Sequence, residues 1–194
     1  MLTDEQIAKN KERYIELLKL IGLDTPEFLE YLESINYFDA PASTQYQGAY
    51  RGGLTEYALK LAHELGVLCD TYFPGKYTEA DVLKVALMKE NYRATMYEVY
   101  RKNVKNEATG QWEAISAYRT KEERPVYGDL GFSSFMTLRK YVDFSDEQLE
   151  AIIHSTGLNS YSVDIHNVLK QYPLVVLTKM ADLVVNNFWE GKLC

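Results

Sequence analysis

The chain has 194 residues, of which 46% are hydrophobic and 25% are charged, and this composition is typical of a globular protein with a proper core. Its formal net charge of −7 argues against a general surface for nucleic acid or anionic membranes, because such surfaces need clustered Lys and Arg, although a small basic pocket is still allowed. The beginning of the chain lacks a signal-peptide pattern, no apolar stretch is long enough to span a membrane, and Cys69 and Cys194 form no metal-type or redox pair. We therefore expect a single domain over residues 1–194, soluble and cytoplasmic, without membrane contact.

Two helices are predicted within residues 1–35. A capping-box pattern at Thr3 opens a run of helically spaced apolar residues, which Gly22 ends. A second, short helix is predicted over residues 25–32, where a capping threonine precedes a proline. The next segment, residues 36–53, contains proline and several glycines and is expected to be irregular.

A longer series of helices is predicted after residue 53. Residues 54–68 place apolar side chains on one helical stripe, which is typical of a core-facing helix. Thr78 is expected to cap the next helix, whose inner stripe starts with Val82 and Ala86. Three further helices are predicted, at about 131–142, 146–156 and 173–189. The last of them has an apolar stripe that includes Phe188.

Residues 95–119 alternate polar and apolar side chains on either side of a polar turn that contains Asn106 and Gly110. This alternation is typical of two strands joined as a β-hairpin. The predicted fold is therefore mostly α, a helical bundle with a small β-hairpin insertion.

Charged residues stand where two helical stripes are expected to be apolar. The stripe that starts at Val82 continues to Lys89, Glu90 and Arg93, and the stripe of the last helix includes Asp182. One interpretation is that these groups lie at a helix end, where they reach water. Because an isolated charge is very costly to desolvate, the other interpretation is an internal polar site that joins the two helices.

Five segments resemble, in order, segments of the HD-domain metal-dependent phosphohydrolases. Tyr50-Arg-Gly-Gly-Leu-Thr-Glu-Tyr-Ala-Leu59 is similar to that family's Tyr-x-Gly-Gly-Leu-x-Glu-His-Ser-Leu, and Val85-Ala-Leu-Met-Lys-Glu-Asn-Tyr-Arg93 is similar to its Ala-Leu-Leu-His-Asp-x-x-Lys. The other three are Tyr127-Gly-Asp-Leu-Gly-Phe-Ser133, Ala151-Ile-Ile-His-Ser-Thr-Gly157 and Ala181-Asp182. The resemblance implies an HD-like core over residues 40–189, and the predicted hairpin resembles an insertion in a short form of the family that bacteriophages often encode.

The resemblance also implies a metal site, and this chain lacks each histidine expected in it. The residues at the family's site positions are, in chain order, Tyr57, Lys89, Glu90, Arg93, Asp129, Ser155 and Asp182. Four of them replace histidines, and His154 lies one position from the place that Ser155 takes. Of the expected acidic ligands, only Asp182 is unchanged.

These replacements favour the loss of the metal. A tyrosine phenol ionises near pH 10 and is a poor ligand at neutral pH, and a protonated lysine cannot ligate a cation. We expect the Lys89 ammonium to occupy the place of the metal and to neutralise Glu90 and Asp182. The sequence therefore predicts no metal, no cofactor and no catalytic residue.

The expected function is binding without hydrolysis. Arg51, Arg93 and Lys89 are candidates for holding the phosphate of a nucleotide or of another phosphorylated small molecule, with Tyr46 and Tyr57 among the candidate stacking surfaces. Alternatively, the arginines form surface ion pairs and the tyrosines pack in the core.

Two other functions remain open. The chain could be a regulator that docks on a host protein or another partner protein through its acidic surface. It could instead be a metal-dependent nucleotide phosphohydrolase with a rebuilt site formed by Glu90, Asp129, Asp182 and His154, in which the three carboxylates could also bind Mg²⁺ through oxygen ligands alone.

Overall fold

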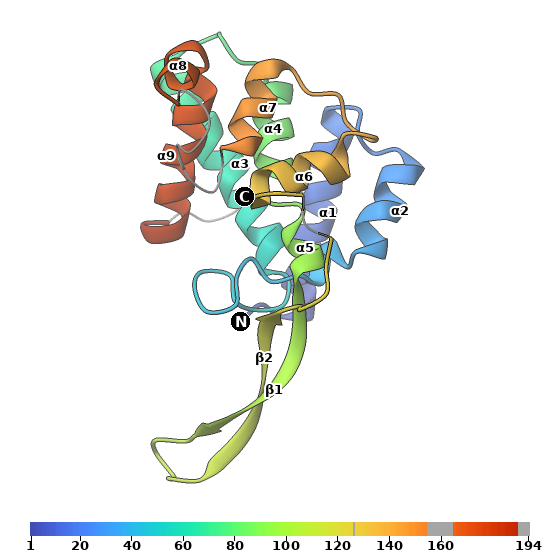
Figure 1. The fold of residues 1–194 in the computed structure, drawn as a ribbon, viewed down its shortest axis with the longest axis vertical. Coiled ribbons are helices and arrows are strands. Elements are labelled where there is room, and N and C mark those ends of the chain that lie inside the picture. The colour runs from blue at the N-terminus through green and yellow to red at the C-terminus, as the bar shows by residue number, and fades with distance from the viewer. Residues whose placement is uncertain (126, 155–164, 190–194) are drawn as a thin grey trace.

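A computed structural model of the chain describes residues 1–125, 127–154 and 165–189. The described residues form a mostly helical body and one two-stranded antiparallel sheet (Figure 1), so the predicted mostly α class with a hairpin is confirmed. The helices are α1 (Asp4–Leu20), α2 (Pro26–Ser34), the 3₁₀ helix η1 (Tyr37–Asp39), α3 (Gly53–Tyr72), α4 (Glu79–Met88), α5 (Arg93–Met96), α6 (Leu130–Leu138), α7 (Asp146–Ile153), α8 (Ile165–Gln171) and α9 (Pro173–Asn187), and the strands are β1 (Tyr97–Lys105) and β2 (Trp112–Thr120).

Side-chain caps form the predicted starts of several helices. At α1, Thr3 Oγ1 accepts a hydrogen bond from Gln6 N at 3.2 Å, and Gln6 Oε1 accepts one from Thr3 N at 2.8 Å. Ser145 forms the same kind of capping box at α7, and Thr25 caps α2 with Pro26 in its first turn. These bonds satisfy amides that a helix start would otherwise leave without partners.

α3 is the central helix of the body. In Figure 1 it lies between α9 on one side and α1 and α4 on the other, and it contacts all three. Leu54, Leu61 and Leu65 are fully buried on the predicted stripe, whereas Leu68 near the end of the helix is only partly buried. The predicted core-facing helix is therefore confirmed.

Two glycines are required where α3 begins. Gly52 has a φ of 79°, a left-handed conformation in which a side chain would be strained. A Cβ added to Gly53 would come within 2.2 Å of the backbone oxygen of Gly48. The two glycines thus let the segment 40–52 fold closely against the N-terminus of α3.

α4 ends at Met88, although its apolar stripe predicts a helix that continues. The hydroxyl of Tyr14 donates a hydrogen bond to the carbonyl of Leu87 at 2.8 Å, and the amide of Asn91 bonds to Met88 O at 3.1 Å, three residues back instead of four. Amides farther along also bond three residues back. The segment 89–92 is therefore a turn that winds more tightly than an α-helix.

Other boundaries also differ from the prediction. α6 and α7 end earlier than predicted, and the predicted helical residues 155–156 lie outside the described residues. Phe188 follows the end of α9 and is 75% exposed, so its predicted place on the apolar stripe is wrong. α8 lies outside the predicted helices; none of its residues is fully buried, and Val168 and Leu169 pack partly buried against the core.

The hairpin extends away from the helical body (Figure 1). Tyr97 pairs with Thr120 at its root, and Lys105 pairs with Trp112 near its tip. In the turn, Asn106 Oδ1 accepts hydrogen bonds from two backbone amides, at 2.9 and 3.2 Å. The predicted hairpin and its asparagine turn are confirmed.

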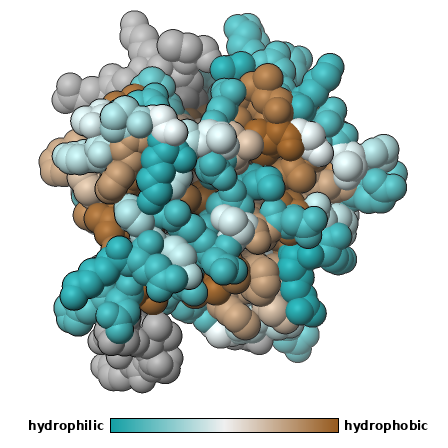
Figure 2. Space-filling model, turned by 90° about the horizontal axis from the view of Figure 1, so that it is seen from above, coloured by the Kyte–Doolittle hydropathy of each residue, from teal (hydrophilic) through white to brown (hydrophobic). Residues whose placement is uncertain are grey.

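The surface in Figure 2 is mostly hydrophilic, and its apolar side chains form separate patches. Most large apolar side chains pack instead in a core to which α1, α3, α4 and α9 contribute. None of the helices in the described part of the chain combines the length and the apolar character that crossing a membrane requires.

The close approach at the start of α3 generates a stability prediction. Gly53→Ala is expected to lower the free energy of unfolding by about 1–3 kcal/mol, because the new Cβ would overlap backbone atoms that cannot move aside easily. Gly66→Ala is the matched control on the same helix, where the nearest atom lies 4.0 Å from an added Cβ. The control should raise the free energy of unfolding by about 0.5–1 kcal/mol. The free energy of unfolding of both variants is measured by urea unfolding. A change in the same direction for both would contradict this account.

Candidate functional site

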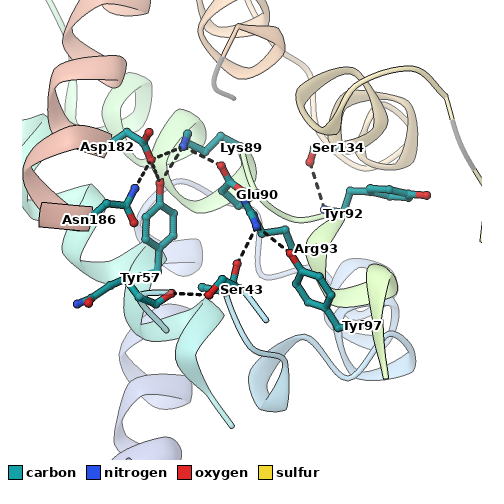
Figure 3. A network of polar contacts seen from close by, with 12 residues as sticks. Ser43, Tyr57, Lys89, Glu90, Tyr92, Arg93, Tyr97, Ser134, Asp182 and Asn186 are labelled. Atoms are coloured by element: carbon teal, nitrogen blue, oxygen red, sulfur yellow. Dashed lines mark hydrogen bonds and ion pairs between the residues drawn. The ribbon is translucent and has the colours of Figure 1, made fainter. Parts of the chain in front are cut away.

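A fully buried lysine lies at the centre of the charged residues that the sequence singles out. Lys89 Nζ donates hydrogen bonds to Tyr57 Oη at 2.8 Å, to Glu90 Oε1 at 2.9 Å and to Asp182 Oδ1 at 3.2 Å (Figure 3). The ammonium has three N–H donors, and each has an oxygen partner. The prediction that Lys89 neutralises Glu90 and Asp182 is confirmed by these two ion pairs.

Asp182, on α9, accepts hydrogen bonds from several directions. Tyr57, on α3, donates its hydroxyl to Asp182 Oδ1. Asn186 lies one turn farther along α9 and donates to the same oxygen at 2.9 Å, and Lys179 Nζ lies 3.4 Å from Oδ2. Side chains from α3, from α9 and from the turn after α4 therefore meet at one carboxylate (Figure 3).

Arg93 extends the cluster toward the hairpin. Its Nε donates to Glu90 Oε2, and its Nη1 donates to the carbonyl of Ala42 and to the hydroxyl of Tyr97, both at 2.8 Å. Glu90 therefore lies between two cations, Lys89 and Arg93. Through Arg93 the cluster is joined to the irregular segment before α3 and to the first residue of β1.

Mutual pairing keeps the cluster ionised although it is buried. Burial would raise the pKa of Glu90, but the charges of Lys89 and Arg93 outweigh it and hold this pKa below its usual range. Burial would likewise raise the pKa of Asp182, and Lys89 and the Tyr57 hydroxyl lower it instead. Burial would lower the pKa of Lys89, but Glu90, Tyr57 and Asp182 raise it above its ordinary value. All three groups are therefore charged at neutral pH.

A cavity of about 360 Å³ opens beside the cluster. Tyr57, Glu90, Arg93 and Asp182 form its charged and aromatic floor. The rest of its lining comes from α9 and from the segment before α3, and consists of Ala42, Ser43, Tyr46, Gln47, Asn186 and Asn187. The lining is thus rich in amide and hydroxyl groups that can both donate and accept hydrogen bonds.

Three predicted site residues are not shown in this cluster. Arg51 is exposed and forms ion pairs with Asp4 at 2.5 Å and with Asp39 at 2.8 Å, as in the alternative interpretation of surface pairing. Asp129 caps α6 by accepting a hydrogen bond from Phe132 N at 2.9 Å. Ser155 lies outside the described residues.

A larger groove, of about 620 Å³, lies between α1 and α3. Three cations line it, and each already has an acidic neighbour. The pairs are Lys9 with Glu5 at 2.9 Å, Arg13 with Glu16 at 3.1 Å and Lys60 with Glu56 at 3.2 Å. All three are local helix pairs, two of them exposed and the pair of Lys60 with Glu56 largely buried, so each of these cations is already neutralised by its own helix.

Sequence reasoning missed some partners of the cluster. Asn186 and Lys179 lie four residues after and three residues before Asp182, a helical spacing that would have indicated them. The contact of Arg93 with Ala42 O joins segments far apart in the sequence, and no local pattern indicates it, whereas Tyr97 lies only four residues after Arg93.

The HD resemblance implies a divalent metal, and the described residues do not fit one. The Lys89 ammonium lies between the two carboxylates that would ligate the ion, and like charge would repel it. Within residues 1–125, 127–154 and 165–189, no three His, Cys, Asp or Glu side chains gather in a way that could hold a metal. His154, a residue of the rebuilt site considered above, pairs with Glu150 at 3.1 Å.

The chain matches no protein-family model, no curated protein and no solved structure. The likeness to HD-domain phosphohydrolases therefore depends on the ordered segments of the sequence alone.

The buried ion cluster makes Lys89 critical for stability. Lys89→Met is expected to lower the free energy of unfolding by about 3–5 kcal/mol, because it leaves Glu90 and Asp182 buried without their shared cation. Lys84→Met is the matched control on α4, since among the described residues Lys84 Nζ donates to one partner, the backbone oxygen of Asp143, at 2.9 Å. The control should cost about 1 kcal/mol or less. If urea unfolding showed equal decreases in the free energy of unfolding for the two variants, the assigned role of Lys89 would be contradicted.

Proposed function

We propose that the chain is a non-hydrolytic relative of the HD-domain phosphohydrolases that binds a nucleotide or a similar phosphorylated small molecule beside the Lys89 cluster. The observation that supports this proposal is the place of Lys89 Nζ, at 2.9 Å from Glu90 and 3.2 Å from Asp182. In the resemblance, these residues belong to the metal site. A lysine there provides the charge of a cation without the ability to activate water.

The cavity is suited to a ligand of this class. Its volume of about 360 Å³ lies within the range of small-molecule sites, roughly 300–1,000 Å³. The hydrogen bonds of Arg93 to the described residues use Nε and Nη1, so its Nη2 remains for a phosphate oxygen. Tyr46 lines the cavity and is 83% exposed, which leaves its ring surface open for stacking on a base.

The rebuilt hydrolase is less well supported. It requires Asp129 and His154 beside Glu90 and Asp182, but Asp129 caps α6 and His154 pairs with Glu150. A regulatory role through contacts with another protein stays a prediction, since the acidic surface alone indicates no particular partner.

Ligand binding is tested by calorimetry with nucleoside monophosphates, cyclic nucleotides and inorganic phosphate, in buffer without metal. We expect binding of at least one nucleotide, and Tyr46→Ala should weaken it about 5- to 100-fold, the usual range for a lost base-stacking contact. Tyr72→Ala is the matched control, because Tyr72 is an exposed tyrosine at the end of α3 and does not line the cavity. No heat with any of these compounds, or equal weakening by both variants, would refute the proposed ligand class.

Metal analysis tests the non-hydrolytic part of the proposal separately. The purified chain should contain far less than one divalent ion per molecule and should release no phosphate from nucleotides. The double variant Tyr57→His, Lys89→His removes the ammonium and restores two imidazoles at the positions where the resemblance places them. This variant should gain measurable affinity for Mn²⁺ or Ni²⁺, provided that circular dichroism shows it folded. Stoichiometric metal in the unmodified protein, together with phosphate release, would establish the rebuilt hydrolase instead.

A further inference from the structure

Within the described part of the chain no third strand pairs with the hairpin, so both of its edges are free there, and its register shows which backbone groups point outward. The amide of Asn106 bonds to Gln111 O at 2.8 Å, and the amide of Lys121 bonds to Met96 O at 2.8 Å. In an antiparallel ladder, hydrogen-bonded and non-hydrogen-bonded residue pairs alternate. The residues of a hydrogen-bonded pair bond to each other, and those of the next pair point their N–H and C=O groups away from the partner strand. With these two pairs facing inward, the residues of β2 with outward N–H and C=O groups are Trp112, Ala114, Ser116, Tyr118 and Thr120.

The two edges differ in the side chains at these outward positions. Those of β1 include Arg101 and Lys105, whereas those of β2 are aromatic, small or hydroxyl-bearing. Lys and Arg along a free edge discourage the addition of another strand. Residues 112–118 contain a single charge and no proline, so the β2 edge lacks this protection.

The hairpin exposes apolar side chains to water. Trp112 is 72% exposed, and Val99 and Ile115 are also exposed on a ribbon about 30 Å long. A two-stranded hairpin alone is marginally stable in water and is stabilised by further strands or by packing. An added strand would bond to the outward groups of β2.

Charge favours a second copy of β2 as the added strand. β2 contains one acidic and one basic residue, Glu113 and Arg119, so two copies side by side bring no excess of either sign together. Two copies of β1 would instead gather Arg101, Lys102 and Lys105 twice. Like charges directly opposite each other destabilise a strand pair.

We propose that two copies of the chain pair antiparallel through β2 to form a four-stranded sheet. In the most apolar register, Ile115 lies opposite Ile115 of the second copy, and Trp112 lies opposite Tyr118 of the second copy on each side of the two-fold axis. Both pairs are of the kinds that stabilise adjacent strands. This pairing does not depend on the proposed ligand, because no β2 residue lines the cavity beside Lys89.

Proline substitutions test the pairing at chosen edges. Ser116→Pro removes an outward N–H on β2 while the inward hydrogen bonds of the hairpin remain, and by symmetry each dimer loses two bonds. Asn103→Pro is the matched control, since it removes an outward N–H from β1. Light scattering coupled to size exclusion should find a dimer in the unmodified chain and in the control. The dissociation constant of Ser116→Pro should rise at least about tenfold.

Circular dichroism and thermal unfolding verify that both variants remain folded. If either proline prevents folding, the variants Ser116→Lys and Asn103→Lys repeat the comparison of the two edges. In the background Trp189→Phe, the fluorescence of Trp112 should shift to the blue as concentration rises. A monomer at every concentration, or a dimer equally sensitive to both edges, would overturn the proposal. So would nucleic acid or another protein bound to the hairpin in place of a second copy.

Discussion

The fold depends on keeping one ammonium group stable where water cannot reach it. Lys89 is fully buried, and removing its charge from water would cost several kcal/mol if the charge stayed unpaired. The compensating carboxylates come from the same turn and from α9, and the bridging hydroxyl of Tyr57 comes from α3. Three segments must therefore meet within hydrogen-bonding distance of one atom, and this requirement fixes how α9 lies against α3 and the end of α4.

The balance of charge explains why a second cation is present. Glu90 and Asp182 are two carboxylates, and Lys89 alone would leave the cluster negative. Arg93 contacts Glu90 from the opposite side, so the buried groups approach neutrality. Because a buried network is stable only when its members are satisfied, the same bonds also hold the cavity wall in one arrangement. A ligand that contacts Arg93 would find its guanidinium already oriented, which lowers the entropy lost on binding.

Sequence patterns predicted the parts of the structure that follow from local physics. The caps at Thr3 and Thr25 and the stripe of α3 depend on spacing along the chain, and charges on a predicted inner stripe indicated that Lys89 needs partners. The end of α4 escaped prediction because the hydroxyl of Tyr14, far away in the sequence, occupies the carbonyl of Leu87. Asp129 was assigned through a motif and Arg51 as a candidate for holding a phosphate, whereas Asp129 serves as a cap and Arg51 pairs with acidic residues on the surface. A motif predicts where a backbone position lies, but competition between nearby partners decides what its side chain does.

The hairpin has no core of its own and begins beside the buried ion cluster. Tyr97, the first residue of β1, accepts a hydrogen bond from Arg93, whose guanidinium also binds Glu90 and the carbonyl of Ala42. The direction in which the ribbon leaves the body is therefore set by the same charges that stabilise the interior. Glu90, Ala42 and Tyr97 use three of the five guanidinium N–H groups, and a ligand phosphate on Arg93 would bind the two that remain on Nη2. The cavity and the root of the ribbon therefore share one guanidinium, whose position its bonds to Glu90, Ala42 and Tyr97 fix before any ligand arrives.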